Sequence, residues 1–165
     1  MELNTKGRYA VMAMADLAKY GAESAIPLSA IAERQGLSVA YLEQIFLRLR
    51  RAGLVESARG RSGGYALARP ATDIPVVDIL RAVEEETRLT RCHDSEEPGC
   101  LGDKRCLTHG LWHALSGHIL AFLSGVSLAE VVHGIPQEKL AYGVKAEQPV
   151  QQPVPAARAP EFAGQ

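Results

Sequence analysis

The chain has 165 residues and a net charge of −1, and 47% of its residues are hydrophobic but only 5% aromatic, so Leu, Ile, Val and Ala must fill its core. No apolar run approaches the roughly 20 residues that cross a bilayer, and the N-terminus lacks an apolar signal sequence. This excludes a membrane-spanning protein, and we expect a cytoplasmic one with no membrane partner.

Three helices are predicted first. Apolar and aromatic residues recur every three or four positions over 5–21, which is typical of one helical face. A short helix over 26–36 ends at Gly36, and a third helix covers 37–53 with Ser38 as its N-cap. The inward stripe of the third helix consists of Leu42, Ile45, Phe46 and Leu49.

The pattern then changes to short extended segments. Residues 54–58 and 65–69 alternate in character and are joined by the glycine-rich "RGRSGG", which predicts a β-hairpin. A fourth helix is predicted over 73–86. A long fifth helix over 108–125 precedes a last short helix that the capping box of Ser127 and Glu130 would open.

These elements predict a mainly α fold with a small β-hairpin wing: a winged helix-turn-helix plus a long dimerisation helix. The fifth helix carries more apolar surface than a small wing domain can cover, which favours a two-fold partner. Its apolar residues are Trp112, Leu115, Ile119, Phe122 and Leu123. We divide the chain into a DNA-binding domain (1–72), a connecting helix (73–91), a cluster-binding loop (92–109), the dimerisation and C-terminal helices (108–135) and a disordered tail (145–165).

The charge is unevenly distributed. Residues 1–72 carry ten Lys or Arg against six Asp or Glu, a net of +4, whereas residues 73–165 carry eight against thirteen, a net of −5. The positive charge peaks over 48–69, with six Arg and one Glu. A local positive surface of this kind attracts polyanions such as nucleic acid.

The helix-turn-helix pattern points to double-stranded DNA, although a three-helix unit with a hairpin also occurs in protein-interaction domains. Gln44 can pair with adenine, Glu43 can accept from cytosine, and Arg48 can meet a phosphate or guanine. Arginine on a glycine-bearing loop can enter a minor groove. The candidate DNA-contacting residues are Ser38, Ala40, Tyr41, Glu43, Gln44, Arg48, Arg59, Gly60 and Arg61.

All three cysteines lie in one stretch with the spacing Cys-x7-Cys-x5-Cys-x2-His, formed by Cys92, Cys100, Cys106 and His109. An odd number of cysteines argues against a closed disulfide framework. Zinc is the usual metal for such a donor set, but neither cysteine gap is the tight pair of most structural zinc sites. An iron–sulfur cluster tolerates wider gaps. A catalytic thiol and three unligated thiols are further alternatives, and His113 is a spare ligand candidate.

Several segments together resemble a winged-helix family of bacterial transcription factors that contains iron–sulfur cluster regulators. They are "TKGRYAV", "LSAIAERQGLS", "YLEQIFLRLRRAGLV", "RGRSGGY", the "RC" of 91–92 and "CLTHGLWHAL". The resemblance covers about residues 1–135. It implies a homodimer that controls cluster-assembly genes, with one 2Fe–2S cluster per subunit on the four residues Cys92, Cys100, Cys106 and His109. It also implies DNA contacts by Ser38, Tyr41, Glu43, Gln44, Arg59 and Gly60.

Two departures from that family stand out. A well-known member has serine where this chain has Ala40, which removes one hydroxyl contact, and the loop between Cys92 and Cys100 is two residues longer here. We therefore expect a cluster-sensing regulator rather than an enzyme, supplied with clusters by assembly or carrier proteins. Glu43 is the expected switch residue, because an unpaired carboxylate at a base edge rejects most DNA sequences. A regulator with a structural zinc site is the alternative, and a thiol-redox enzyme is the third.

Overall fold

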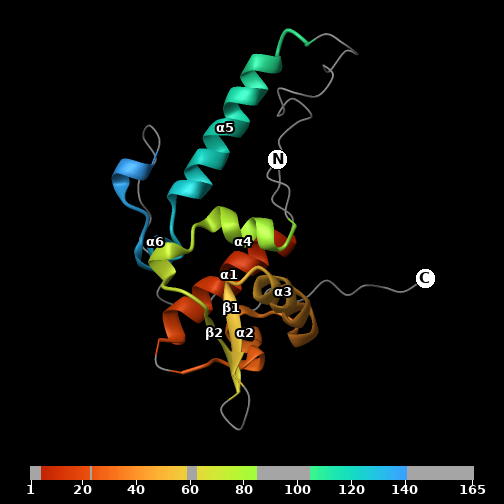
Figure 1. The fold of residues 1–165 in the computed structure, drawn as a ribbon, viewed down its shortest axis with the longest axis vertical. Coiled ribbons are helices and arrows are strands. Elements are labelled where there is room, and N and C mark those ends of the chain that lie inside the picture. The colour runs from red at the N-terminus through yellow and green to blue at the C-terminus, as the bar shows by residue number, and fades with distance from the viewer. Residues whose placement is uncertain (1–4, 23, 59–62, 85–104, 141–165) are drawn as a thin grey trace, which may run out of the picture.

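The computed structural model describes residues 5–22, 24–58, 63–84 and 105–140, which form a mainly helical fold with one small hairpin (Figure 1). In chain order the elements are α1 (Thr5–Tyr20), α2 (Leu28–Gln35), α3 (Val39–Arg51), β1 (Val55–Ala58), β2 (Gly64–Leu67), the 3-10 turn η1 (Ala71–Asp73), α4 (Val76–Ala82), α5 (His109–Gly125), α6 (Leu128–His133) and the 3-10 turn η2 (Gln137–Lys139). The predicted fold class is confirmed. In these ranges no helix combines the length and apolar character needed to cross a bilayer.

The helix-turn-helix consists of α2, a tight turn and α3. Gly36 ends α2 at a φ of 64°, in the left-handed region that glycine adopts without strain, and its amide donates to the carbonyl of Ala32. Ser38 opens α3, because its hydroxyl oxygen accepts from the amide of Tyr41 at 3.2 Å. Both helix ends lie where the sequence predicts them.

The hairpin is an antiparallel pair in which Val55 of β1 lies opposite Leu67 of β2. The segment before α2 joins it, since Ile26 and Tyr65 exchange both backbone hydrogen bonds, at 2.9 and 2.8 Å. A Cβ at Gly64 would lie 2.4 Å from the backbone of Ile26, so glycine alone permits this approach. The wing is therefore attached directly to the start of the helix-turn-helix.

One hydrophobic core joins α1, α2, α3, β1 and α4. Its buried side chains are Ala10, Ala13, Met14, Leu17, Ile31, Ala32, Leu42, Ile45, Phe46, Leu49, Leu54, Val55, Ile74, Ile79, Val83 and Leu128. The ring of Phe46 meets the ring of Tyr65 edge-on, with centroids 4.8 Å apart, so the core also fixes the wing. The inward stripe predicted for the third helix is confirmed.

The fourth helix is shorter than the predicted range of 73–86. Pro75 keeps the residue before it extended, so Asp73 stays in η1 and α4 begins only at Val76. At the other end Glu84 has a φ of 57°, which departs from the helical path. Helix α4 therefore ends at Ala82, before the acidic residues that the predicted range of 73–86 included.

Helix α5 extends away from the rest of the fold in Figure 1 and meets α4 near its own C-terminal end. None of its residues is buried. After α5, Ser127 and Glu130 form the predicted capping box, in which each accepts a hydrogen bond from the backbone amide of the other. Helix α6 then packs against α1. The predicted disordered tail, residues 145–165, lies outside the described residues.

Candidate functional site

The exposed face of α3 carries four of the predicted DNA-contacting residues. Ser38, Ala40, Glu43 and Gln44 are all exposed, and the buried stripe of the helix faces the opposite way into the core. Within the described ranges no basic side chain forms an ion pair with Glu43. Its carboxylate is therefore presented to the solvent, as a base-edge discriminator requires.

Tyr41, a predicted DNA-contacting residue, packs partly into the fold. It is half-buried, its ring packs against the main core, and it meets the ring of Tyr9 edge-on with centroids 5.9 Å apart. This contact holds the first turn of α3 against α1.

Arg48 is half-buried and forms an ion pair with Glu84, the residue that ends the α4 region. The hydrogen bond from Arg48 lowers the pKa of the Glu84 carboxyl from its ordinary value. The positive charge of Arg48 adds a smaller effect on this pKa in the same direction. The pair lies in a cleft of about 480 Å³ between α3 and α4. Sequence patterns missed Glu84 here, because an acidic residue in an "EEE" run reads as a solvated helix face.

The wing residues are described only in part. Arg50 reaches from α3 toward β1, where its guanidinium donates to the hydroxyl of Ser57 at 3.5 Å. Arg59, Gly60 and Arg61, the predicted wing contacts, lie outside the described residues, in the stretch that joins β1 to β2.

Two of the four predicted ligands are described, and they lie together at the start of α5. Cys106 is half-buried just before the helix, and His109 is its first residue. The amide of His109 donates to the carbonyl of Cys106 at 3.1 Å, which closes a turn between them. Thr108 contributes to this turn, since its hydroxyl oxygen accepts from the indole of Trp112 at 3.2 Å and lies 3.5 Å from the Cys106 sulfur.

This donor set fits an iron–sulfur cluster or zinc, because both accept thiolate and imidazole ligands. Cys92 and Cys100 lie outside the described residues, and among the residues that are described no three potential ligands gather around one point. The ring of His113 stacks over the ring of His109, with centroids 6.1 Å apart and an interplanar angle of 16°. A replacement ligand therefore lies one helical turn from His109.

Four large apolar residues of α5 are exposed within a single chain, whereas Leu123 packs against the cluster of Val76, Leu80 and Val126. The exposed fractions are 61% for Leu111, 39% for Leu115, 39% for Leu120 and 40% for Phe122. A helix whose apolar side chains stay in contact with water gains little stability from forming, because burial of those side chains supplies most of the stabilisation of helices in proteins.

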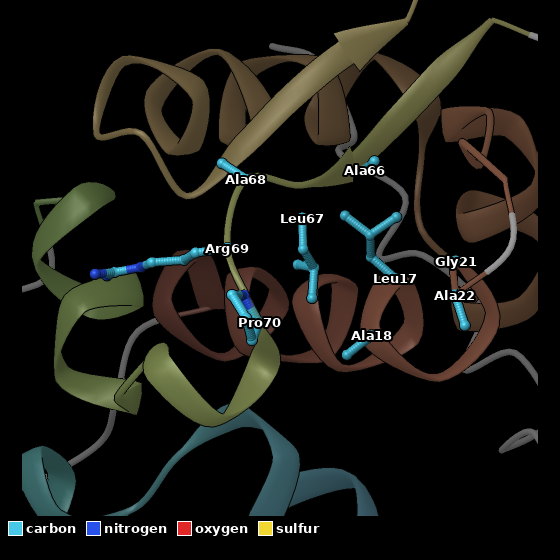
Figure 2. Close-up of a pocket in the computed structure, with 9 residues that line it drawn as sticks. All are labelled: Leu17, Ala18, Gly21, Ala22, Ala66, Leu67, Ala68, Arg69 and Pro70. Carbon is cyan, nitrogen blue, oxygen red and sulfur yellow. The ribbon is translucent and has the colours of Figure 1, made fainter.

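A second concave region lies between the end of α1 and the strand β2 (Figure 2). Its volume is about 440 Å³ and its lining is small and apolar apart from Arg69. Arg69 extends toward α4, where its guanidinium donates to Asp78 at 2.8 Å. None of the residues that line this region is His, Cys, Asp or Glu, so it offers no metal or acid–base chemistry.

Known proteins with this sequence pattern are transcriptional regulators. Residues 3–134 match the model of the Rrf2 family, which is described as an iron-dependent transcriptional regulator. The HTH-type transcriptional regulator IscR of Photorhabdus laumondii subsp. laumondii is 52% identical over 133 residues, covering 81% of this chain and 80% of that protein.

Solved structures of similar proteins have the same architecture. The structure of T. potens IscR has a TM-score of 0.67 and 39% identity, covering 87% of this chain and 94% of that chain. CymR, the global cysteine regulator of B. subtilis, has a TM-score of 0.67 and 33% identity, covering 80% of this chain and 96% of that chain.

Proposed function

The chain belongs to the Rrf2 family of transcriptional regulators, and from this premise we propose that it is a cluster sensor whose choice of DNA site changes when a 2Fe–2S cluster is bound. The observation that carries the proposal is the placement of Cys106 and His109 in one turn at the start of α5. Its relatives are regulators rather than enzymes, so we assign no catalytic residue.

DNA would be read by the exposed face of α3 and by the wing. Gln44 is exposed and suited to a bidentate contact with adenine. The Ser38 hydroxyl oxygen accepts from the Tyr41 amide, and its own hydrogen can donate to DNA. Ala40 offers only a methyl group for contact with thymine. Arg59, Gly60 and Arg61 would extend the contact to the neighbouring groove.

The ligands of the cluster would be Cys92, Cys100, Cys106 and His109, one cluster per subunit. When bound, the cluster supplies a redox-active centre whose gain or loss reports iron–sulfur supply. The protein holds two of the donors at one helix end, so ligation would act on α5 and on the connection to α4. The cluster must favour one of two DNA-reading states, since a ligand with equal affinity for both shifts nothing.

Glu43 would convert this bias into sequence choice. Its carboxylate stands exposed beside Gln44, where it rejects base edges that offer no donor. A cluster-dependent change in the position of α3 would relieve that rejection at a second class of operator. Genes of iron–sulfur cluster assembly are the proposed targets, with assembly or carrier proteins as cluster donors in the cytoplasm.

The active form would be a homodimer formed through α5. Four large apolar side chains of this helix are exposed in one chain, and a two-fold partner is the simplest way to cover them. A dimer would also present two α3 helices to successive major grooves.

Anaerobic purification tests the proposal. We expect coloured protein with roughly two iron and two sulfide ions per subunit, and we expect Cys106→Ala to remove the visible absorption. Operator binding with and without cluster should then differ in sequence preference. Colourless protein that holds one zinc ion per subunit would contradict the cluster assignment and support a structural zinc site.

A further inference from the structure

The cleft between α3 and α4 is lined by three arginines and a single acidic residue. Arg48 and Arg51 come from α3, Arg81 comes from α4, and Glu84 follows α4. The lining itself carries three positive charges against one negative charge, and Arg81 also forms an exposed ion pair with Asp78 of its own helix at 3.9 Å. Guanidinium groups donate in a fork that matches the oxygens of a phosphate.

Glu84 is held in this cleft by its charge rather than by burial. Its side chain is 75% exposed, and its carboxylate forms an ion pair with Arg48. Its backbone φ of 57° is unusual for a residue other than glycine. Glu84 thus forms its ion pair from a backbone conformation that is costly for glutamate. While DNA is absent, this ion pair keeps the guanidinium of Arg48 paired with a carboxylate.

The cleft continues the predicted DNA-reading face. Gln44 lines it together with Arg48 and Arg51, and these three residues are spaced at four and three positions along α3, which places them on one side of the helix. A duplex read by Gln44 would bring its backbone along the same side. The helix-turn-helix pattern predicts no DNA contact for Arg81, which belongs to α4.

We propose that the cleft of Arg48, Arg51 and Arg81 binds a phosphate of the DNA backbone, and that Glu84 is the internal anion which this phosphate displaces. This inference rests on the proposed DNA-binding function and adds to it a phosphate site and a competitor. Because a phosphate contact carries no sequence information, the competition acts alike on every DNA sequence. Glu84 sets the strength of binding, whereas Glu43 sets its selectivity.

The test is a titration of the full-length protein with random-sequence duplex DNA at several salt concentrations, because non-specific binding depends on phosphate contacts. Glu84→Gln should raise the affinity by about 2- to 5-fold per subunit, the range expected for release of an exposed ion pair. Glu138→Gln, which removes an exposed negative charge from η2, away from α3 and the wing, is the matched control and should have a smaller effect. Equal effects of the two changes would overturn the role of Glu84.

Arg81→Ala tests the site itself. It should weaken binding to all sequences and reduce the slope of log affinity against log salt by about 1 per subunit. An unchanged slope would overturn the phosphate site, whereas wild-type protein that binds no DNA at all would instead overturn the proposed function. Inorganic phosphate serves as the alternative probe. If it stabilises Glu84→Gln against unfolding while DNA affinity stays at the wild-type value, the cleft takes a free anion and the inference is wrong.

Discussion

The guanidinium of Arg34 in α2 donates two hydrogen bonds to the buried carboxylate of Asp16 in α1: Nη2 lies 2.6 Å from Oδ1 and Nε lies 3.0 Å from Oδ2. Gln35 adds a third donor at 2.8 Å. Asp16 is only 3% exposed and is the one buried charged residue in the described part of the chain. The pair fixes how the first helix of the helix-turn-helix packs on α1.

The first prediction is that removing Arg34 costs more stability than removing Asp16. Arg34→Ala leaves a carboxylate buried with one amide donor, so it should lower the free energy of unfolding by about 3–5 kcal/mol. Asp16→Ala should cost less, because the Arg34 side chain is already 29% exposed and can turn to water. Urea denaturation of both variants measures the difference. The reverse order would show that packing around Asp16, and not its charge, dominates.

The second prediction concerns Glu43. Glu43→Ala should strengthen binding of cluster-free protein to cluster-dependent operators by about 1–3 kcal/mol, the cost of one wrong base contact. Binding to operators that need no cluster should change less. Glu33→Ala, an exposed acidic residue on α2, is the control for net charge. Equal gains at both operator classes would mean that Glu43 contributes only uniform repulsion.

The third prediction separates two stacked histidines. His109→Ala should lose or destabilise the cluster, while His113→Ala should retain it, because only His109 lies in the turn that contains Cys106. Visible absorption and iron content after anaerobic reconstitution measure the outcome. A silent His109→Ala together with a damaging His113→Ala would place the ligand one helical turn further along α5.

The fourth prediction concerns acid stability. Hydrogen bonds from Lys139 and from the Ser127 backbone lower the pKa of Glu130 to about 2 from the ordinary value of 4.5. A depressed pKa means that the ionised form stabilises the fold above pH 4.5, and this stabilisation is lost as the pH falls from 4.5 toward 2. Glu130→Gln should therefore be less stable than wild type at pH 7, and the difference should shrink toward pH 2. A constant difference across denaturation curves at pH 7 and pH 3 would contradict this.

The fifth prediction concerns assembly. Leu115→Glu places a charge on the apolar face of α5 and should convert a dimer into monomers at micromolar concentration, as measured by sedimentation equilibrium. Gly117→Glu is the matched control on the same helix, since a Cβ at Gly117 meets no atom within 4 Å. If both variants remain dimeric, the subunits associate through another surface.

Local signals predicted much of the fold. Ser38 and the Ser127–Glu130 capping box predicted two helix starts correctly, because a cap acts within four residues. The predicted hairpin over 54–58 and 65–69 is confirmed as β1 and β2, with slightly different ends.

Contacts between distant segments were beyond these signals. Asp16 and Arg34 are 18 residues apart, and neither looks buried in the sequence. Tyr41 is not part of the predicted inward stripe, yet its ring packs against the core and meets the ring of Tyr9. Arg48 was assigned to DNA without its ion pair to Glu84, since the left-handed backbone of a glutamate has no sequence signature. The sequence predicts four cluster ligands. The structure describes two of them, Cys106 and His109.

The bridge between Ile26 and Tyr65 has a consequence for the entropy of DNA binding. Two backbone hydrogen bonds and the close approach at Gly64 hold β2 against the segment that leads into α2. The strands of the wing and the helix-turn-helix are therefore oriented relative to one another before DNA arrives. Little orientational freedom of these parts remains to be lost on binding, so their contacts contribute more fully to affinity.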